Sequence, residues 1–233
     1  MGKVKRPTRR RHLRASVELA VEYRTAGGFL VSYSTDLSYG GVFLETPSPL
    51  EQGTQLTLRM HVPGLGAPLE TVATVAWIRA KATPEGLPPG MGLEFAALEG
   101  EFGEAIDRLV ESFGRLRVAL LGGNPETRAL LSRYLRGVFS CDVLEAVPQA
   151  GEGPPCDLVV ADLDSIEEGG TWVLERCRTE WGIPVAAVSR NNDLRDRARR
   201  AGAAEVLPSP PAFTDFQAAV LRAVSRPTVV VRA

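Results

Sequence analysis

The chain has 233 residues, of which 44% are hydrophobic and 24% are charged. These ordinary values exclude a disordered, collagen-like or coiled-coil chain. At about 150 residues per domain, the length fits one large domain or two small ones. No apolar run approaches the roughly 20 residues of a membrane span, and no apolar signal-peptide segment follows the N-terminal basic residues, so we expect a cytoplasmic protein.

The net charge of −1 conceals an uneven distribution of basic residues. Seven of the 27 basic residues fall within residues 1–14, which contain no acid and which we call the basic arm. The rest of the chain carries 20 basic against 28 acidic residues, a net charge of −8. Such an arm is either a solvated tail or a clamp for phosphate, a nucleotide, nucleic acid or membrane headgroups.

Residues 15–98 contain short segments typical of β-strands. Val17, Leu19, Val21 and Tyr23 alternate with polar residues, which predicts a half-buried strand. Clusters of Gly, Pro, Asp and Ser separate the segments that follow. The six predicted strands are residues 16–23, 29–34, 42–46, 55–61, 71–78 and 92–95, with a surface loop at 81–90. Six short strands with turns between them favour a small barrel or sandwich.

The hydrophobic pattern changes near residue 99. Phe102, Ile106, Leu109, Val110 and Phe113 recur at helical spacing, which predicts an amphipathic helix within residues 99–115.

From residue 116 to 226, apolar runs of parallel-sheet type alternate with helical segments. This alternation predicts a doubly wound α/β domain of flavodoxin-like type, and leaves residues 227–233 as a tail. Asn124 and Pro125 suit the N-cap and first turn of a helix that ends near residue 136. Other helices are expected at about 170–180, 193–201 and 214–224. The Pro- and Gly-rich segment 147–156 is too short for a helix.

Two arginines in the basic arm suggest a ligand clamp. Arg10 and Arg14 are four residues apart, so both guanidinium groups lie on one side of the arm and can converge on one ligand. A guanidinium group stacks on a purine face and forks onto phosphate oxygens or onto the O6 and N7 edge of guanine.

A second cluster, residues 36–41, falls in the turn between two predicted strands. Asp36 can accept hydrogen bonds from the donor edge of a guanine, and Ser38 can bond a phosphate or a backbone group. Gly40 and Gly41 permit a positive φ and close backbone approach. A simple turn that closes a hairpin is the alternative interpretation.

The two clusters together form a more specific pattern. R-x-x-x-R, then D-x-S-x-x-G, then the sequence GMGLEF at residues 90–95 resemble the PilZ family over about residues 8–113. The resemblance implies a six-stranded antiparallel barrel that binds the bacterial second messenger cyclic di-GMP, with the basic segment wrapping the ligand. The implied ligand-binding residues are Arg10, Arg11, Arg14, Asp36, Ser38, Gly40 and Gly41.

The C-terminal part resembles a response-regulator receiver domain over about residues 116–224. Asp162 stands at the phosphoacceptor position, with Gly170 eight residues later. Ser189 ends the predicted fourth strand as the hydroxyl residue, and the sequence from Gly202 to Glu205 matches the Gly-Ala turn of the family.

Three departures from the receiver pattern concern the chemistry of phosphoryl transfer. Gly122 and Gly123 replace the acidic pair that holds Mg²⁺, and Ser209 replaces the lysine that steadies the phosphoryl group. Phosphoryl transfer needs a metal and a cation to offset the developing charge. We therefore expect a pseudo-receiver without a metal site, with Asp162 as a vestigial phosphoacceptor and the domain serving as an interaction or dimerisation surface.

Side chains that could act as nucleophiles or metal ligands are few. Cys141, Cys156 and Cys177 show no C-x-x-C spacing, which predicts neither a disulfide framework nor a zinc site, and we expect reduced, mostly buried thiols. His12 lies in the arm and His61 near a strand, in unrelated places, and no nucleophile has a base beside it. The chain is therefore expected not to be an enzyme and to need no cofactor.

The leading hypothesis is a non-catalytic cyclic di-GMP receptor that acts through protein contacts of its pseudo-receiver. The runner-up is a nucleotide-independent scaffold that acts through protein contacts alone. Nucleic-acid binding ranks third, because the body is acidic and the arm lacks aromatic residues for stacking bases. The protein partner is not identified, and a homodimer remains open.

Overall fold

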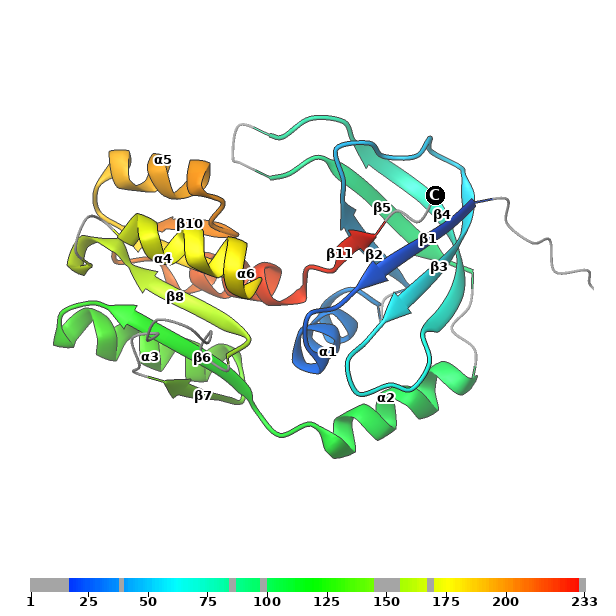
Figure 1. The fold of residues 1–233 in the computed structure, drawn as a ribbon, viewed down its shortest axis with the longest axis horizontal. Helices are drawn as coiled ribbons and strands as arrows, with labels where there is room; N and C mark the ends of the chain where they lie inside the picture. Colours follow the sequence, from blue (N-terminus) through cyan, green and yellow to red (C-terminus); the bar gives the residue numbers. More distant parts are fainter. Residues whose placement is uncertain are drawn as a thin grey trace, which may run out of the picture.

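The computed structural model describes residues 17–37, 40–83, 87–96, 100–144, 156–166 and 170–230. These residues form two units that lie side by side, an N-terminal mixed sheet with two helices and a C-terminal parallel sheet with helices on both faces (Figure 1). Among them, we find no helix with the length and apolar character needed to cross a membrane.

The N-terminal sheet encloses one apolar core with its inward-facing side chains. Its order is β11-β1-β3-β4-β5-β2, and β1 and β3 run parallel whereas the other neighbours are antiparallel. The strands are β1 (Val17–Glu22), β2 (Gly41–Glu45), β3 (Gln55–His61), β4 (Leu69–Arg79), β5 (Gly90–Phe95) and β11 (Thr228–Val230). The described parts of the loop at 81–90 contain no regular element before β5, as the sequence predicted.

Three features of this sheet differ from the predicted antiparallel barrel. Strands β1 and β3 run parallel to each other. Strand β11 comes from the segment expected to be a tail and crosses over to pair with β1, as Figure 1 shows in red. The predicted strand at residues 29–34 is instead helix α1 (Ala26–Thr35). Among the described residues no backbone pairing joins β11 to β2, so a closed barrel is not confirmed.

Helix α1 forms where a strand was predicted because both of its sides are buried. Thr25 is its N-cap, and the Thr25 hydroxyl accepts a hydrogen bond from the Gly28 N–H at 3.0 Å. Phe29 enters the core of the N-terminal unit, whereas Val31 enters the core of the C-terminal unit. Alternation along a short apolar segment does not reveal burial against a second domain, so the strand prediction was wrong.

Glycines allow α1 to approach the C-terminal unit closely. A Cβ atom on Gly27 would come within 2.7 Å of the Leu116 side chain, and one on Gly28 within 2.8 Å of the Val224 carbonyl oxygen. Helix α1 therefore packs against helix α6 (Phe213–Ser225) with its backbone, at a helix propensity cost of about 1 kcal/mol per glycine.

Helix α2 (Gly100–Ser112) confirms the predicted amphipathic helix. Phe102, Ile106 and Leu109 are buried in the N-terminal core. Val110 does not join them and is 56% exposed. At about 100° per residue it lies roughly 80° around the helix from Phe102, at the edge of the apolar stripe.

The C-terminal unit is the predicted doubly wound sheet. Its strands are β6 (Leu116–Gly122), β7 (Cys141–Leu144), β8 (Leu158–Asp162), β9 (Val185–Ser189) and β10 (Glu205–Pro208). All neighbours run parallel in the order β10-β9-β8-β6-β7, which is the 2-1-3-4-5 order of flavodoxin-like folds read from the other edge.

Helices cover both faces of this sheet and follow the predicted positions. One core contains residues of α3 (Pro125–Val138) and α6, and the other contains residues of α4 (Thr171–Arg176) and α5 (Asn192–Ala201). Asn124 caps α3 as predicted, accepting from the Thr127 N–H at 2.9 Å. A π-helical turn, Cys177–Trp181, extends α4. Most of segment 147–156 lies outside the described residues.

Candidate functional site

The turn after α1 carries the acceptor predicted for a guanine. Asp36 is the C-cap of α1, and its N–H donates to the Ser32 carbonyl oxygen at 2.8 Å. The turn therefore joins a helix to β2 rather than joining two strands. The Asp36 side chain is exposed, although partial enclosure raises the pKa of its carboxyl group above the ordinary value.

Gly40 and Gly41 have the conformational roles predicted for them. Gly40 has a φ of +91°, and its carbonyl oxygen accepts from the Phe95 N–H at 2.7 Å. A Cβ atom on Gly41 would lie 2.6 Å from the Leu93 carbonyl oxygen. The two glycines thus fix the turn closely against β5.

The other predicted ligand-binding residues lie outside the described part of the chain. These are Arg10, Arg11 and Arg14 of the basic arm and Ser38 of the turn. Their roles in ligand binding remain predictions.

A pocket of about 420 Å³ opens beside Asp36. Besides the acid, it is lined by side chains and backbone of α1, β2, β4 and β5: Thr35, Gly41, Val42, Phe43, Trp77, Gly92 and Leu93. The sequence predicted Asp36 and Gly41 here but not the two aromatic residues, whose outward positions on β2 and β4 could have indicated them.

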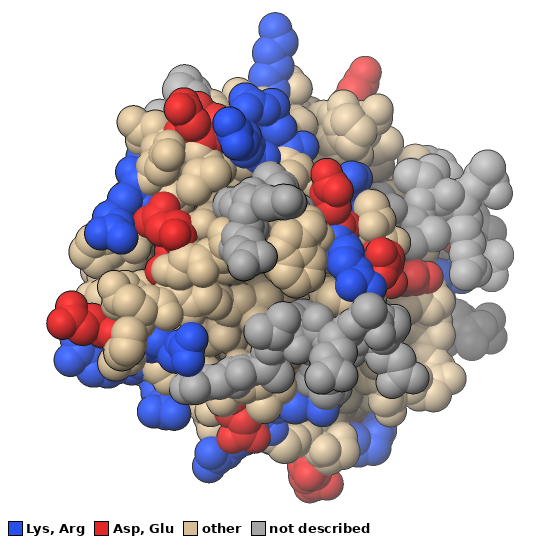
Figure 2. Space-filling view, turned by 60° about the vertical axis from the view of Figure 1, so that its left-hand side comes forward, with Lys and Arg blue, Asp and Glu red and all other residues tan. Residues whose placement is uncertain are grey.

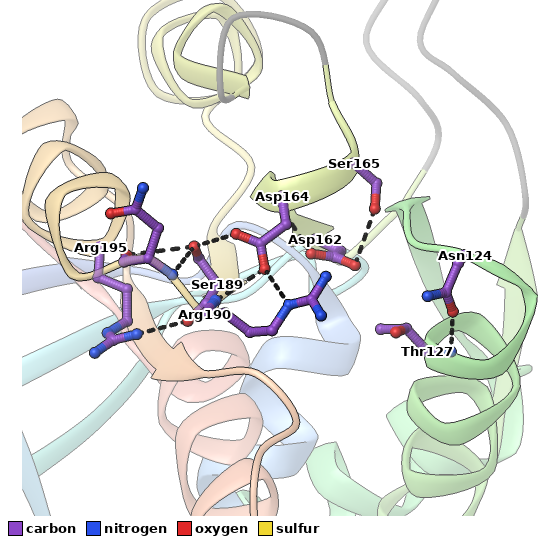
Figure 3. Close-up of polar contacts among 9 residues, drawn as sticks. Asn124, Thr127, Asp162, Asp164, Ser165, Ser189, Arg190 and Arg195 are labelled. Atoms are coloured by element: carbon purple, nitrogen blue, oxygen red, sulfur yellow. Dashed lines mark hydrogen bonds and ion pairs between the residues drawn. The ribbon is translucent and has the colours of Figure 1, made fainter.

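The C-terminal unit presents a second group of carboxylates, at the end of β8 (Figure 3). Asp162 is only 4% exposed. Its two carboxylate oxygens accept hydrogen bonds from the Asp164 N–H at 3.2 Å and from the Ser165 hydroxyl at 3.3 Å. Burial raises the pKa of Asp162 above the ordinary carboxyl value.

Asp164 holds the end of β9. Its carboxylate accepts hydrogen bonds from the Ser189 hydroxyl at 2.6 Å and from the Arg190 N–H at 2.8 Å, and it forms an ion pair with the Arg190 side chain at 3.3 Å. Partial burial would raise the pKa of Asp164, but these hydrogen bonds and the arginine charge outweigh it and lower that pKa. Ser189 therefore faces Asp164 (Figure 3).

The loop after β6 has no carboxylate. Gly122 and Gly123 have φ angles of +72° and +84°, a region that disfavours other residues. A Cβ atom on Gly122 would lie 2.6 Å from the Asp162 carbonyl oxygen, so the backbone excludes a larger residue there. Ser209, at the lysine position, donates its N–H to the Ser189 carbonyl oxygen at 3.1 Å.

These residues do not fit the Mg²⁺ ion that receiver domains hold. Within the described ranges, no group of three or more His, Cys, Asp or Glu side chains could hold a metal ion. Hard cations such as Mg²⁺ prefer several oxygen ligands, and here Asp164 is already bonded to Ser189 and Arg190.

The buried thiols offer no reactive group. Cys141, Cys156 and Cys177 are all buried and free, as predicted. Burial raises the pKa of the Cys141 and Cys156 thiols above the ordinary value. It raises the pKa of Cys177 to about 12. The thiolate is the reactive form, so these three protonated thiols are poor nucleophiles at neutral pH.

Comparison with protein families finds one match. Residues 8–112 match the model of the PilZ domain. The N-terminal unit is a PilZ domain. The matched region includes both arginines of the R-x-x-x-R motif and extends through helix α2.

Solved structures match the C-terminal part of the chain, which has the strand order of receiver domains. A protein assigned to pilus assembly from Burkholderia thailandensis E264 is 21% identical, with 48% of this chain and 99% of that chain covered and a TM-score of 0.41. A protein assigned as a response regulator from Chloroflexus aurantiacus J-10-fl is 16% identical, with 48% and 100% covered and a TM-score of 0.44. A response regulator receiver domain protein from Clostridium thermocellum is 18% identical, with 47% and 94% covered and a TM-score of 0.40. A comparison with curated proteins finds no match.

The PilZ domain and the receiver-like domain are also joined by polar contacts. Arg226, just before β11, forms ion pairs with Glu45 of β2 at 3.2 Å and with Glu205 of β10 at 2.9 Å. Arg24, just before α1, donates to the Cys156 carbonyl oxygen at 2.6 Å. Together with strand β11 and the packing of α1 on α6, these contacts fix one domain against the other.

Proposed function

We propose that the chain is a non-catalytic, cytoplasmic receptor for cyclic di-GMP whose receiver-like domain acts through protein contacts. The observation that carries the proposal is the turn of the PilZ domain, where Asp36 lines a pocket and both glycines hold the backbone that the motif requires. The Asp36 side chain is exposed, and a carboxylate has two oxygens that can accept hydrogen bonds from the donor edge of a guanine.

The basic arm supplies the complementary charge in this proposal. Cyclic di-GMP carries two negative phosphates, and Arg10 and Arg14 belong to the matched PilZ region. Their guanidinium groups would fork onto phosphate oxygens or stack on a base, with Arg11 adding positive charge. Binding should therefore weaken as the salt concentration rises.

Helix α1 is the element that would couple the two domains. Its C-terminal end is Asp36, its Ser32 hydroxyl shares a hydrogen bond with the Tyr23 hydroxyl at 3.0 Å, and its Val31 lies in the receiver-like core. A ligand that repositions the Asp36 turn would therefore shift the helix that packs on α6. Such coupling requires that cyclic di-GMP binds more tightly to the protein when α1 is in one position than when it is in another.

The surface of the receiver-like domain suits a protein partner better than nucleic acid. Figure 2 shows basic and acidic side chains intermixed on this face, without a continuous basic stripe in its coloured part. Nucleic-acid binding domains gather their basic residues on one face. The partner is either another protein or a second copy of this chain.

The Asp162 site supports a surface that does not depend on phosphorylation. Ser189 is already hydrogen-bonded to Asp164, and no side chain at Gly122 or Gly123 supplies a metal ligand. In this proposal the receiver-like domain is constitutive, and cyclic di-GMP is the signal.

Isothermal titration of the full chain tests the proposal. Cyclic di-GMP should bind saturably at physiological salt, whereas GTP and cyclic di-AMP should bind far more weakly, because Asp36 recognises guanine and the clamp needs two phosphodiesters. Equal heats for all three nucleotides, or no saturable binding of cyclic di-GMP, would contradict the receptor and favour a scaffold that acts through protein contacts alone.

A further inference from the structure

Two stacked aromatic rings line the pocket next to Asp36. The register places Phe43 of β2 and Trp77 of β4 on either side of Gly92 of β5. A Cβ atom on Gly92 would lie 2.1 Å from the Trp77 indole nitrogen, and one on Gly90 would lie 2.5 Å from the Phe43 ring. The two glycines therefore leave the space in which both rings rest against β5.

The two rings are nearly parallel and stacked on each other, and part of the stack is open to solvent. The ring planes differ by only 12° and the centroids are 5.2 Å apart. The Arg79 guanidinium carbon lies 4.8 Å from the Phe43 centroid and 5.4 Å from the Trp77 centroid. Trp77 nevertheless remains 44% exposed. An irregularity in the β4–β5 pairing between Val75 and Trp77 shifts the register just before this tryptophan.

The rings and Asp36 line the same pocket. A ligand group in this pocket would therefore contact both aromatic rings and a carboxylate. A nucleobase has a flat π-face and hydrogen-bonding groups on its edge, so it can stack on aromatic rings while its edge faces a carboxylate. A purely apolar ligand would not use Asp36, and a bare phosphate would not use the rings.

We propose that Phe43 and Trp77, with Arg79 over them, form a stacking platform for a guanine base of the ligand, next to Asp36. This inference rests on the proposed cyclic di-GMP function. It adds to the candidate ligand site residues that lie outside the R-x-x-x-R motif and outside the D-x-S-x-x-G motif. The platform contributes base affinity, and Asp36 contributes discrimination for guanine.

The alternative is that the rings only cover the glycines of β5 and stabilise the sheet. Two substitutions separate these roles. Trp77→Phe keeps an aromatic face, whereas Trp77→Leu keeps apolar cover over Gly92 but has no π-face. Val72→Ala is the control, because Val72 is the other large exposed apolar residue on β4 and does not line the pocket.

The test measures the dissociation constant of cyclic di-GMP for these full-length variants, with thermal unfolding to show that each is folded. We expect Trp77→Leu to weaken binding about 10- to 100-fold, the range for losing one base–aromatic stack, and Trp77→Phe and Val72→Ala to change it less than about threefold. If Trp77→Leu is unfolded, the same comparison is made with Phe43→Leu.

Tryptophan fluorescence gives a second readout. In a Trp172→Phe, Trp181→Phe background, Trp77 is the one remaining tryptophan, and saturating cyclic di-GMP should change its emission. Parent affinity in Trp77→Leu together with unchanged Trp77 emission would overturn the platform while leaving the receptor intact. A parent chain that does not bind cyclic di-GMP would overturn the proposed function itself, and the platform with it.

Discussion

The Asp36 turn and the Asp162–Asp164 loop both place carboxylates where a known family has functional ones, yet their surroundings differ. Asp36 is exposed and lines a pocket. Asp162 and Asp164 are enclosed and bonded to Ser165, Ser189 and Arg190. A carboxylate whose hydrogen bonds are made within the protein stabilises a loop, and one with acceptor capacity left over can bind a ligand.

The largest loss of cyclic di-GMP affinity is expected from substitutions in the basic arm. Replacing Arg10 or Arg14 with alanine should weaken cyclic di-GMP binding by about 2–4 kcal/mol, the scale for losing a charge-assisted contact and a stacked base. Arg10→Lys should lose most of the affinity as well, because lysine has neither a planar face nor a fork. Isothermal titration measures the effect, with Arg108→Ala on the exposed side of α2 as control. Parent affinity in all three arm variants would show that the site assignment is wrong.

The second prediction tests whether Asp164 stabilises the loop in which it lies. Asp164→Ala should lower the free energy of unfolding by about 1–3 kcal/mol, because Ser189 and Arg190 lose a partially buried acceptor. Chemical denaturation measures this loss, and cyclic di-GMP affinity of the folded variant should stay unchanged. A variant as stable as the parent would mean that the loop is not held by this carboxylate.

Asp36 should control ligand discrimination rather than stability. Asp36→Ala should reduce the preference for cyclic di-GMP over cyclic di-AMP about tenfold, since one charge-assisted pair of hydrogen bonds to guanine is lost. The ratio of the two dissociation constants is the readout, and Asp107→Ala on the exposed side of α2 is the matched control. An unchanged ratio would assign guanine recognition to other residues.

The pH dependence of stability should have opposite signs at the two enclosed acids. The pKa of Asp164 is lowered by folding, so its contribution is present above the ordinary carboxyl pKa and lost as the pH falls through the folded value. The pKa of Asp162 is raised, so its contribution is lost as the pH rises through the folded value. Asp162→Asn should therefore slightly raise the free energy of unfolding at pH 7. Denaturation curves between pH 4 and pH 7 would contradict this if Asp162→Asn were the less stable protein at neutral pH.

The last prediction is that Asp162 is not phosphorylated, so no change in mass is expected. Incubation with acetyl phosphate and Mg²⁺ should leave the intact mass of the chain unchanged, because Gly122 and Gly123 supply no metal ligand and Ser209 supplies no cation. A stoichiometric mass increase that disappears in Asp162→Asn would show a working receiver.

The sequence predicted elements that local patterns determine. The parallel strands, the Asn124 cap and the two glycines of the Asp36 turn follow from apolar runs and turn chemistry, and the structure confirms them. Helix α1 was missed because its two buried sides face different domains. Strand β11 was missed because three residues near a chain end have no periodicity to read.

The aromatic side of the candidate site depends on register. Phe43 and Trp77 are 34 positions apart in the sequence, and they meet only because β5 lies between β2 and β4 with Gly92 in register with both. A sequence pattern predicts which segments are strands, but it does not predict which residues of different strands lie next to each other in the sheet. The motif residues Asp36 and Gly41 were found because they are close together in the chain.

Hydrogen exchange of the full chain, with and without saturating cyclic di-GMP, tests the central claim that the PilZ domain signals through α1 to the receiver-like domain. We predict slower exchange in peptides from α1 and also in α6, which α1 contacts. Gly28→Ala should reduce the α6 response, since its Cβ would meet the Val224 carbonyl oxygen, whereas Gly103→Ala, where a Cβ meets nothing, should retain it. Exchange changes confined to the PilZ domain, with α6 unaffected by bound ligand, would contradict the account.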